Sequence, residues 1–255
     1  MRRLYLFNPP RSQSFEINHF WSRWFNTLRL RSGTVQASVK LDHHWYSANL
    51  LIEKHRGKYW GKLGECEIIR PEPGLTVLLA VLKDFYMDLA VRSMSELEVT
   101  TLYLFKSEHS VGFVNQGTLS KLERISLEHA SLIGREIPLE LKFFASLKSL
   151  LVWLEKKDSC DELIAIHRHE TLKYYFWPLA EKKLSENDLK FPCIGCIGPE
   201  GDFTAKETDL LKSHGFEPKN LGDRVLTSWS TACLISSLCY ARKRFFAPEL
   251  NLHSF

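Results

Sequence analysis

The chain has 255 residues, enough for one large domain or two small ones and for a core without disulfides. Hydrophobic residues make up 44% and charged residues 25%, a composition that excludes a disordered or fibrous protein. No apolar run approaches the roughly 20 residues that span a membrane. The first ten residues hold only a short apolar stretch, which is not typical of a signal peptide. We therefore expect a cytoplasmic protein without a membrane partner.

Lysine and arginine number 34 against 30 aspartate and glutamate residues, a formal net charge of +4. This mild excess permits a nucleic-acid partner but does not require one, because only basic residues clustered on one face attract a polyanion. Six cysteines are present. In a chain of this length without a signal peptide, we expect reduced thiols rather than a disulfide framework.

The first 70 residues are predicted to be rich in β-strands. Residues 31–41 and 45–54 carry β-branched and aromatic residues in partly alternating patterns. Residues 55–65 hold three glycines and predict a turn. The segment Arg70–Gly74 holds two prolines and a glycine and is the best candidate for a linker.

A short helix is predicted over residues 21–31, where Trp21, Trp24 and Phe25 lie at helical spacing. These rings and Trp45 lie near several arginines, a mixture that can stack on RNA and bind its phosphates. We expect the rings to belong to the core of a small domain and the arginines to contact RNA.

After Gly74 strands and helices alternate. Residues 75–82 are a continuous apolar run, as in a strand buried on both faces of a sheet. Ser120 and Glu123 have the spacing of a capping box. Further strands are predicted at 100–105, 139–144, 162–167 and 191–198, and helices at 84–98 and 120–134. The alternation predicts an α/β fold with a parallel sheet covered by helices on both faces.

The most informative motif is Gly198-Pro-Glu-Gly201, which directly follows the apolar strand 193–197. Glycines permit a positive φ and a close approach of a ligand to the main chain. Thr204 and Glu207 then form a capping box that opens a helix. Because ligands bind at the carboxyl ends of parallel strands, the motif is placed where a cofactor would lie. The alternative is a tight strand-to-helix turn without a ligand.

A second glycine turn, Asn220–Leu226, follows at the end of another strand. Small residues from Ser228 to Ala232 then open an apolar helix. Two glycine turns that flank one helix are able to frame a pocket.

In this order, the two turns resemble the C-terminal signature of the SPOUT methyltransferases. More narrowly, they resemble the bacterial 16S rRNA uracil-N3 methyltransferases. Weaker matches to the same family, each unspecific alone, lie at Met1–Phe7, His19, Thr27–Gly33, Ser95–Val99, Ser107–Ser110, Glu128–Pro138 and Ile164–His167.

The resemblance implies a fold and a reaction. Residues 1–70 would be a PUA-like β-barrel that helps to bind RNA, and residues 75–248 a SPOUT α/β domain with a C-terminal trefoil knot. The enzyme would be a homodimer that transfers a methyl group from S-adenosylmethionine to N3 of a uridine in 16S rRNA of the small ribosomal subunit. The N3 proton must leave, so the site needs a base or a group that stabilises the developing anion.

The resemblance also implies site residues. Arg224 and His109 would act on the substrate; for each, a surface side chain without a specific function is the alternative. Arg23, Arg29, Arg31 and Arg135 would contact RNA. The cofactor would lie against Ile166, His167, Ile197, Gly198, Pro199, Glu200, Gly201, Leu221, Gly222, Val225, Leu226 and Ala232.

The chain departs from the family pattern near the substrate. Thr227 stands where the family has arginine, Trp229 where it has glutamate, and Leu132 where it has glutamine. His109 replaces an arginine and Asp202 a glycine. Three interpretations follow: the same reaction with altered residues, methylation of another RNA nucleotide, or a non-catalytic RNA-binding protein.

Cys193 and Cys196 form a C-x-x-C pair, and His167 and His169 are nominal further zinc ligands. The cysteines lie in an apolar strand pattern and no second C-x-x-C is present. Buried, inert cysteines are the better interpretation, and we expect no metal.

Overall fold

The computed structural model describes residues 3–11, 13–160 and 171–246. Two compact units divide the chain: Met1–Glu72 with Leu127–Pro138, and Pro73–Ser126 with Leu139–Phe255. The chain first crosses between the units inside the segment predicted as a linker. No pattern in the sequence predicts that residues 127–138 return to the first unit.

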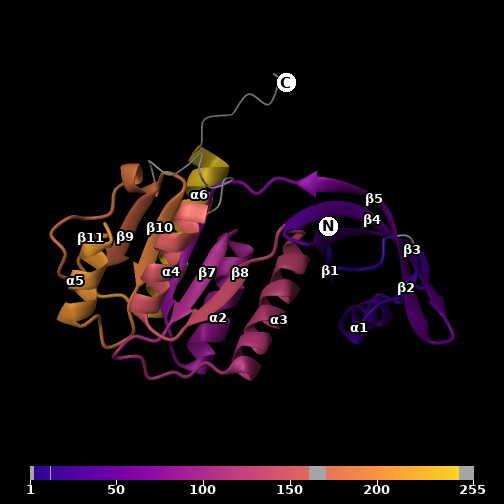
Figure 1. The fold of residues 1–255 in the computed structure, drawn as a ribbon, viewed down its shortest axis with the longest axis horizontal. Helices are drawn as coiled ribbons and strands as arrows, with labels where there is room; N and C mark the ends of the chain where they lie inside the picture. Colours follow the sequence, from indigo (N-terminus) through magenta and orange to yellow (C-terminus); the bar gives the residue numbers. More distant parts are fainter. Residues whose placement is uncertain (1–2, 12, 161–170, 247–255) are drawn as a thin grey trace, which may run out of the picture. The chain divides into compact units, whose positions relative to one another are not determined.

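The first unit is built on a five-stranded sheet that curls into a half-barrel (Figure 1). Strands β3, β4 and β5 pair antiparallel, whereas β1 pairs parallel with β3. In spatial order the strands are β1 (Leu4–Phe7), β3 (Ser32–Leu41), β4 (His44–His55), β5 (Lys58–Ile69) and β2 (Phe15–Glu16). The prediction of a β-rich N-terminal fold is confirmed.

Helix α1 (His19–Thr27) supplies aromatic side chains to the core of this unit. Trp21 and Phe25 are buried. Trp24 and Trp45 pack, partly buried, against the same core. The expectation that these rings are core residues is therefore confirmed.

Two predictions in this unit are wrong in detail. The helix predicted over 21–31 ends early, because Arg29 adopts a left-handed φ of 53° that helical residues do not take. The predicted turn over 55–65 is mostly strand. Gly61 lies within β5, and a Cβ there would lie 3.0 Å from Leu50 Cδ1. This glycine makes room for packing and does not mark a turn.

Residues 127–138 are held in the first unit by a buried arginine. Arg3 donates from Nη1 to Glu136 Oε1 at 3.0 Å and from Nη2 to Ser47 Oγ at 3.1 Å. Ser38 Oγ donates to the carbonyl of Glu136 at 2.5 Å. A buried guanidinium is stable only with its donors satisfied, so this network fixes the segment against the sheet.

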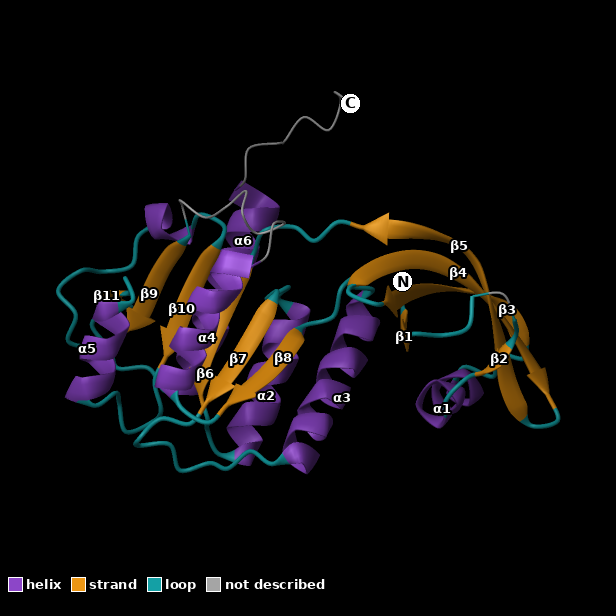
Figure 2. Cartoon of the chain, viewed as in Figure 1, coloured by secondary structure: helices purple, strands orange, loops and turns teal. Residues whose placement is uncertain are grey.

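The second unit contains a six-stranded sheet in which every pair of neighbours is parallel (Figure 2). The strands, in spatial order, are β11 (Glu217–Lys219), β9 (Leu172–Phe176), β10 (Cys193–Ile197), β6 (Leu75–Ala80), β7 (Thr101–Phe105) and β8 (Glu140–Phe144). The predicted α/β fold with a parallel sheet is confirmed.

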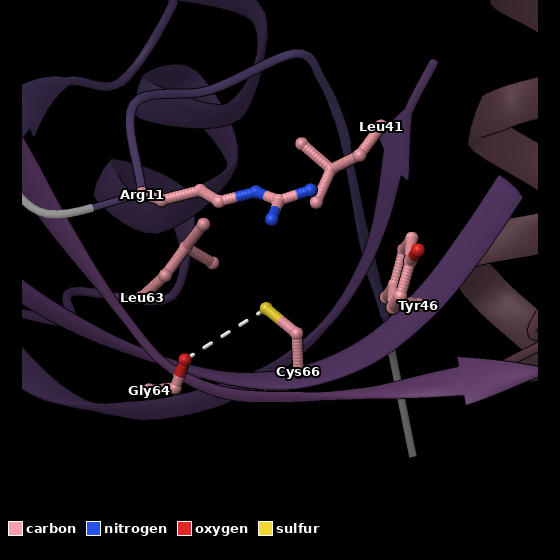
Figure 3. Close-up of a pocket in the computed structure, with 6 residues that line it drawn as sticks. All are labelled: Arg11, Leu41, Tyr46, Leu63, Gly64 and Cys66. Atoms are coloured by element: carbon pink, nitrogen blue, oxygen red, sulfur yellow. Dashed lines mark hydrogen bonds between the residues drawn. The ribbon is translucent and has the colours of Figure 1, made fainter. Parts of the chain in front are cut away.

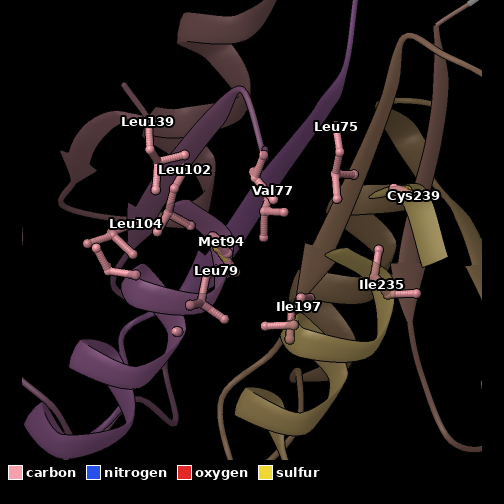
Figure 4. Packing of buried hydrophobic residues seen from close by; sticks show 14 of the residues in the cluster. Leu75, Val77, Leu79, Met94, Leu102, Leu104, Leu139, Ile197, Ile235 and Cys239 are labelled. Atoms are coloured by element: carbon pink, nitrogen blue, oxygen red, sulfur yellow. The ribbon is translucent and has the colours of Figure 1, made fainter. Parts of the chain in front are cut away.

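Helices cover both faces of this sheet. They are α2 (Asp84–Glu96), α3 (Gln116–Ile133), α4 (Leu147–Cys160), α5 (Ala205–Ser213) and α6 (Ser228–Ala241). Leu75, Val77 and Leu79 of β6 point into one core cluster together with α2 and α6 (Figure 4). Leu78 and Ala80 point into the opposite cluster, with α4 and α5. The prediction that this apolar run is buried on both faces is confirmed.

The predicted start of one helix in the second unit is wrong. Helix α3 begins at Gln116, so Ser120 lies inside the helix and does not cap it. The helix predicted at 84–98 is α2, which turns Met87 inward and leaves Phe85 and Tyr86 exposed.

The strand predicted at 162–167 lies outside the described residues. The strands that pair with β10 are β6 and β9. Of α6, Ile235 and Cys239 are buried in the core, whereas Leu238 is exposed. Within the described ranges, no helix is long and apolar enough to cross a membrane.

Candidate functional site

Four loops of the second unit follow the carboxyl ends of parallel strands of one sheet and so lie at the same edge of that sheet (Figure 2). Residues 106–112 follow β7 and residues 198–203 follow β10. Residues 177–180 follow β9, and residues 220–227 follow β11. This edge is the candidate site.

The Gly198–Gly201 loop is shaped by packing. A Cβ at Gly198 would lie 3.1 Å from the ring of Phe203, and a Cβ at Gly201 would lie 3.1 Å from Cβ of His109. The expected positive φ is not found at either glycine but at Asp202, with φ 58°. Both glycines are therefore explained by close contacts with protein side chains.

The predicted capping box is confirmed. Thr204 Oγ1 accepts a hydrogen bond from the Glu207 amide at 3.3 Å, and Glu207 Oε2 accepts one from the Thr204 amide at 3.0 Å. Glu207 is buried, and its Oε1 accepts a further hydrogen bond from the amide of Glu108 at 3.2 Å. This carboxylate thus joins the start of α5 to the loop after β7.

His109 makes a second connection between these loops. Its Nδ1 lies 2.9 Å from the carbonyl oxygen of Gly201 and 3.0 Å from that of Asp202. The imidazole is exposed. Hydrogen bonds to the carbonyls of Asp202 and Gly201 raise the pKa of His109 above its ordinary value.

Asn220 joins the loops after β9 and β11, and the sequence interpretation missed this role. Its Nδ2 donates to the carbonyls of Pro178 at 3.3 Å and Ala180 at 3.2 Å. Its Oδ1 accepts from the amide of Gly222 at 2.6 Å. The sequence signal that could have identified the loop after β9 is the aromatic run of that strand, followed by Trp177 and Pro178.

The turn after Asn220 presents its side chains to solvent. Gly222 adopts φ 122°, and no atom lies within 4 Å of the position of a Cβ. Arg224, Val225 and Leu226 are exposed. Among the described residues, none forms a hydrogen bond or ion pair with the Arg224 guanidinium.

Two of the family departures have structural roles. Thr227 caps α6, since its Oγ1 accepts from the Ser230 amide at 3.2 Å. Trp229 packs against the core, and its buried Nε1 has no hydrogen-bond partner in the described part of the chain. Leu132 is exposed, and Ala232 is fully buried.

The remaining predicted cofactor residues divide by exposure. Ile197, Gly198 and Pro199 are buried, whereas Glu200 and Gly201 are exposed. Leu221 is half-buried. The predicted residues Ile166 and His167 lie outside the described residues, as does His169.

The predicted RNA-binding arginines all belong to the first unit. Arg23, Arg29 and Arg31 are exposed. Arg135 is half-buried, and its Nε donates to the carbonyl of Ile137 at 2.5 Å. Part of the Arg135 guanidinium is thus committed to the fold.

The C-x-x-C pair cannot bind one metal, because Cys193 and Cys196 belong to core clusters on opposite faces of the sheet. A hydrogen bond with the Cys239 thiol, together with burial, raises the pKa of Cys193, and burial raises the pKa of Cys196. Both thiols are unreactive in this state. The described residues hold no group of three metal-ligating side chains.

A shallow pocket of about 210 Å³ lies in the first unit (Figure 3). Arg11 and Cys66 point into it, beside Tyr46 and Leu63. It belongs to the half-barrel and not to the loops of the second unit.

The RNA methyltransferase domain family matches residues 70–239, about two thirds of the chain. The chain belongs to this family. The match covers all four loops of this RNA methyltransferase domain. None of the curated proteins matches the chain.

Solved structures share the fold of this RNA methyltransferase. One is a Legionella pneumophila protein assigned as a methyltransferase, in complex with the cofactor SAM. It is 21% identical, with a TM-score of 0.69 over 94% of this chain and 96% of that chain. The ribosomal RNA small subunit methyltransferase E of Neisseria gonorrhoeae, bound to S-adenosyl methionine, is 18% identical, with a TM-score of 0.69 over 95% and 97%. A Porphyromonas gingivalis protein assigned as an rRNA methyltransferase is 15% identical, with a TM-score of 0.72 over 96% and 100%.

Proposed function

We propose that this protein is an S-adenosylmethionine-dependent methyltransferase that modifies N3 of a uridine in 16S rRNA. The observation that carries the proposal is the set of loops at the carboxyl edge of the sheet, joined in two pairs, which contains the Gly198–Gly201 motif inside the matched family region. Two relatives of the same fold are described with bound S-adenosylmethionine, and one of them is a small-subunit rRNA methyltransferase.

The loops suit a nucleoside cofactor. Leu179 and Val225 are each 77% exposed, so both of these loops offer an apolar side chain to a ligand. The space around Gly222 is open. Apolar surface with a few convergent polar groups is the usual composition of a cofactor site. In this proposal residues 177–180 line the cofactor site, whereas the predicted Ile166 and His167 lie outside the described residues.

S-adenosylmethionine supplies an electrophilic methyl group, so the protein has mainly to orient the acceptor and stabilise its anion. Arg224 is exposed without a partner among the described residues, which leaves its guanidinium available to a uracil anion or an RNA phosphate. The exposed Arg23, Arg29 and Arg31 would contact RNA phosphates from the first unit. N3 is occupied in paired RNA, so the target uridine must be unpaired or flipped.

We extend the proposal to a knotted homodimer located in the cytoplasm. The exposed Leu238 on α6 supplies an apolar contact for a second copy, whereas Ile235 and Cys239 of the same helix belong to the core. This part of the proposal rests on the family resemblance, and sedimentation of the purified protein tests the dimer.

The test is methyl transfer to 16S rRNA, free and in small subunits, followed by mass spectrometry of the nucleosides. We expect 3-methyluridine. Arg224→Ala should lower kcat about 100-fold, the usual loss when a donor to a developing anion is removed. Arg124→Ala, which removes another exposed arginine of the second unit, is the matched control and should have no effect.

Two other outcomes would replace the proposal. Another methylated nucleoside would indicate a different target. This alternative is favoured at Thr227 and Trp229, which replace the family's arginine and glutamate and serve the fold. Cofactor or RNA binding without any turnover would indicate a non-catalytic RNA-binding protein.

A further inference from the structure

The loop after β7 contains a lysine that binds main-chain carbonyls and not a carboxylate. Lys106 Nζ donates to the carbonyl of Ser110 at 2.6 Å and to that of Gly112 at 2.9 Å. No carboxylate of the described residues forms an ion pair with it. One ammonium group thus closes residues 106–112 into a compact loop.

The same loop lies tightly against the end of the central strand β6. A Cβ at Gly112 would lie 1.9 Å from the carbonyl oxygen of Leu82, so only glycine fits this position. Ser110 Oγ accepts a hydrogen bond from the Ser107 amide at 3.1 Å. The loop is therefore fixed both internally and to the sheet.

From this fixed loop, two contacts reach the Gly198–Gly201 loop and the helix behind it. The His109 imidazole contacts the carbonyls of Gly201 and Asp202. The Glu108 amide donates to the buried Glu207 carboxylate. The close approach of His109 to Gly201 explains the second glycine of the motif. Both ends of the Gly201–Glu207 turn are thus tied to the loop after β7.

We propose that Lys106 and His109 are positioning residues that hold the Gly198–Gly201 loop in the conformation that binds the cofactor. The inference rests on the proposed function. A loop that is ordered before binding loses less conformational entropy when the ligand arrives, and its affinity is higher for that reason. Removing the imidazole frees two carbonyls and should weaken cofactor binding while the fold persists.

This role differs from a catalytic one in what it changes. Removing a positioning residue raises the dissociation constant for S-adenosylmethionine. It has little effect on turnover at saturating cofactor. Loss of a general base lowers kcat by about 10²–10⁴-fold and leaves cofactor affinity unchanged. If His109 instead acts in catalysis, His109→Ala would lower kcat and leave the affinity for S-adenosylmethionine unchanged.

The first experiment measures the dissociation constant of S-adenosylmethionine by calorimetry. We expect His109→Ala to weaken binding about tenfold and Lys106→Met to weaken it similarly. His109→Asn, whose amide nitrogen can occupy the place of Nδ1, should restore binding to within about threefold. His214→Ala is the matched control: His214 Nδ1 contacts the Leu210 carbonyl at 2.8 Å, away from the loops, and its loss should leave the affinity unchanged.

The second experiment follows hydrogen exchange of residues 198–203 without cofactor. The Asp202 amide donates to the Pro199 carbonyl at 3.1 Å, so its protection reports whether the loop is closed. Exchange should accelerate in His109→Ala and not in His214→Ala. Unchanged exchange, or equal affinity in His109→Ala and the wild type, would overturn the inference. Faster exchange together with no cofactor binding by the wild type would support the loop contact and refute the proposed function instead.

Discussion

Lys219 and Asp188 show how single residues fix the region around the second glycine turn. Their charged groups lie 2.8 Å apart with side chains only 8% and 14% exposed. Burial opposes ionisation of Asp188, but hydrogen bonds from Lys219 and Ser185 outweigh it and lower the pKa of Asp188. The pair ties residues 186–189 to β11, the strand that leads into Asn220.

We expect Lys219→Met to lower the free energy of unfolding by about 2 kcal/mol, because the largely buried Asp188 carboxylate loses its cation and keeps the hydrogen bonds from Ser185. Lys182→Met is the control: Lys182 is 72% exposed and 3.9 Å from Glu217, a surface pair worth at most about 1 kcal/mol. Urea unfolding measures both. Equal losses in the two variants would contradict this account of the buried pair.

The pH dependence of Lys219→Met has a definite sign. The lowered pKa of Asp188 means that the ion pair stabilises the fold fully above the ordinary carboxyl pKa, and that this stability is lost as the pH falls through the folded-state pKa. The difference between variant and wild type should therefore narrow below about pH 4. A difference independent of pH would mean that the lysine acts by packing alone.

At the scale of single elements, the capping-box pattern predicted the start of a helix correctly at only one of its two occurrences. Thr204 and Glu207 follow a turn and form a true capping box. Ser120 and Glu123 have the same spacing but lie inside α3. Asn115 caps α3 instead, since its Oδ1 accepts from the Thr118 amide at 2.8 Å.

Asn115→Ala should cost about 1 kcal/mol of stability, the usual price of a lost helix cap. Ser120→Ala should change the free energy of unfolding by less than about 0.5 kcal/mol, as for other exposed substitutions. Thermal unfolding of both variants decides between the two caps. A larger effect at Ser120 would show that the helix begins where the sequence pattern alone places it.

At the scale of the whole molecule, the sequence predicted the α/β class, the parallel sheet and the placement of Gly198–Gly201 after a strand. These features depend on local periodicity, which any fold of this class must satisfy. The order of the strands and the return of residues 127–138 to the first unit depend on contacts between distant segments, such as Arg3 with Glu136. No local pattern encodes such contacts.

The candidate site was predicted unevenly for the same reason. Its motifs were recognisable, but the contacts that join the loops were not. Lys106 binds main-chain carbonyls within its own loop, whereas His109 and Asn220 bind carbonyls of segments distant in the chain. Every residue type carries a main-chain carbonyl, so the residue types do not reveal these contacts. The aromatic strand β9 was missed because its five residues carry no alternating pattern.

Calorimetric titration of S-adenosylmethionine into the purified protein tests the central claim most directly. We expect one cofactor per chain in the wild type and a loss of at least tenfold in affinity in Gly222→Val, because a side chain there is strained at φ 122° and enters the open space. Gly57→Val is the control: Gly57 lies in the β4–β5 turn of the other unit with φ 82°, so a side chain there is similarly strained. This variant should bind S-adenosylmethionine with the affinity of the wild type. No binding by the wild type, or equal binding by Gly222→Val, would contradict a cofactor site at these loops.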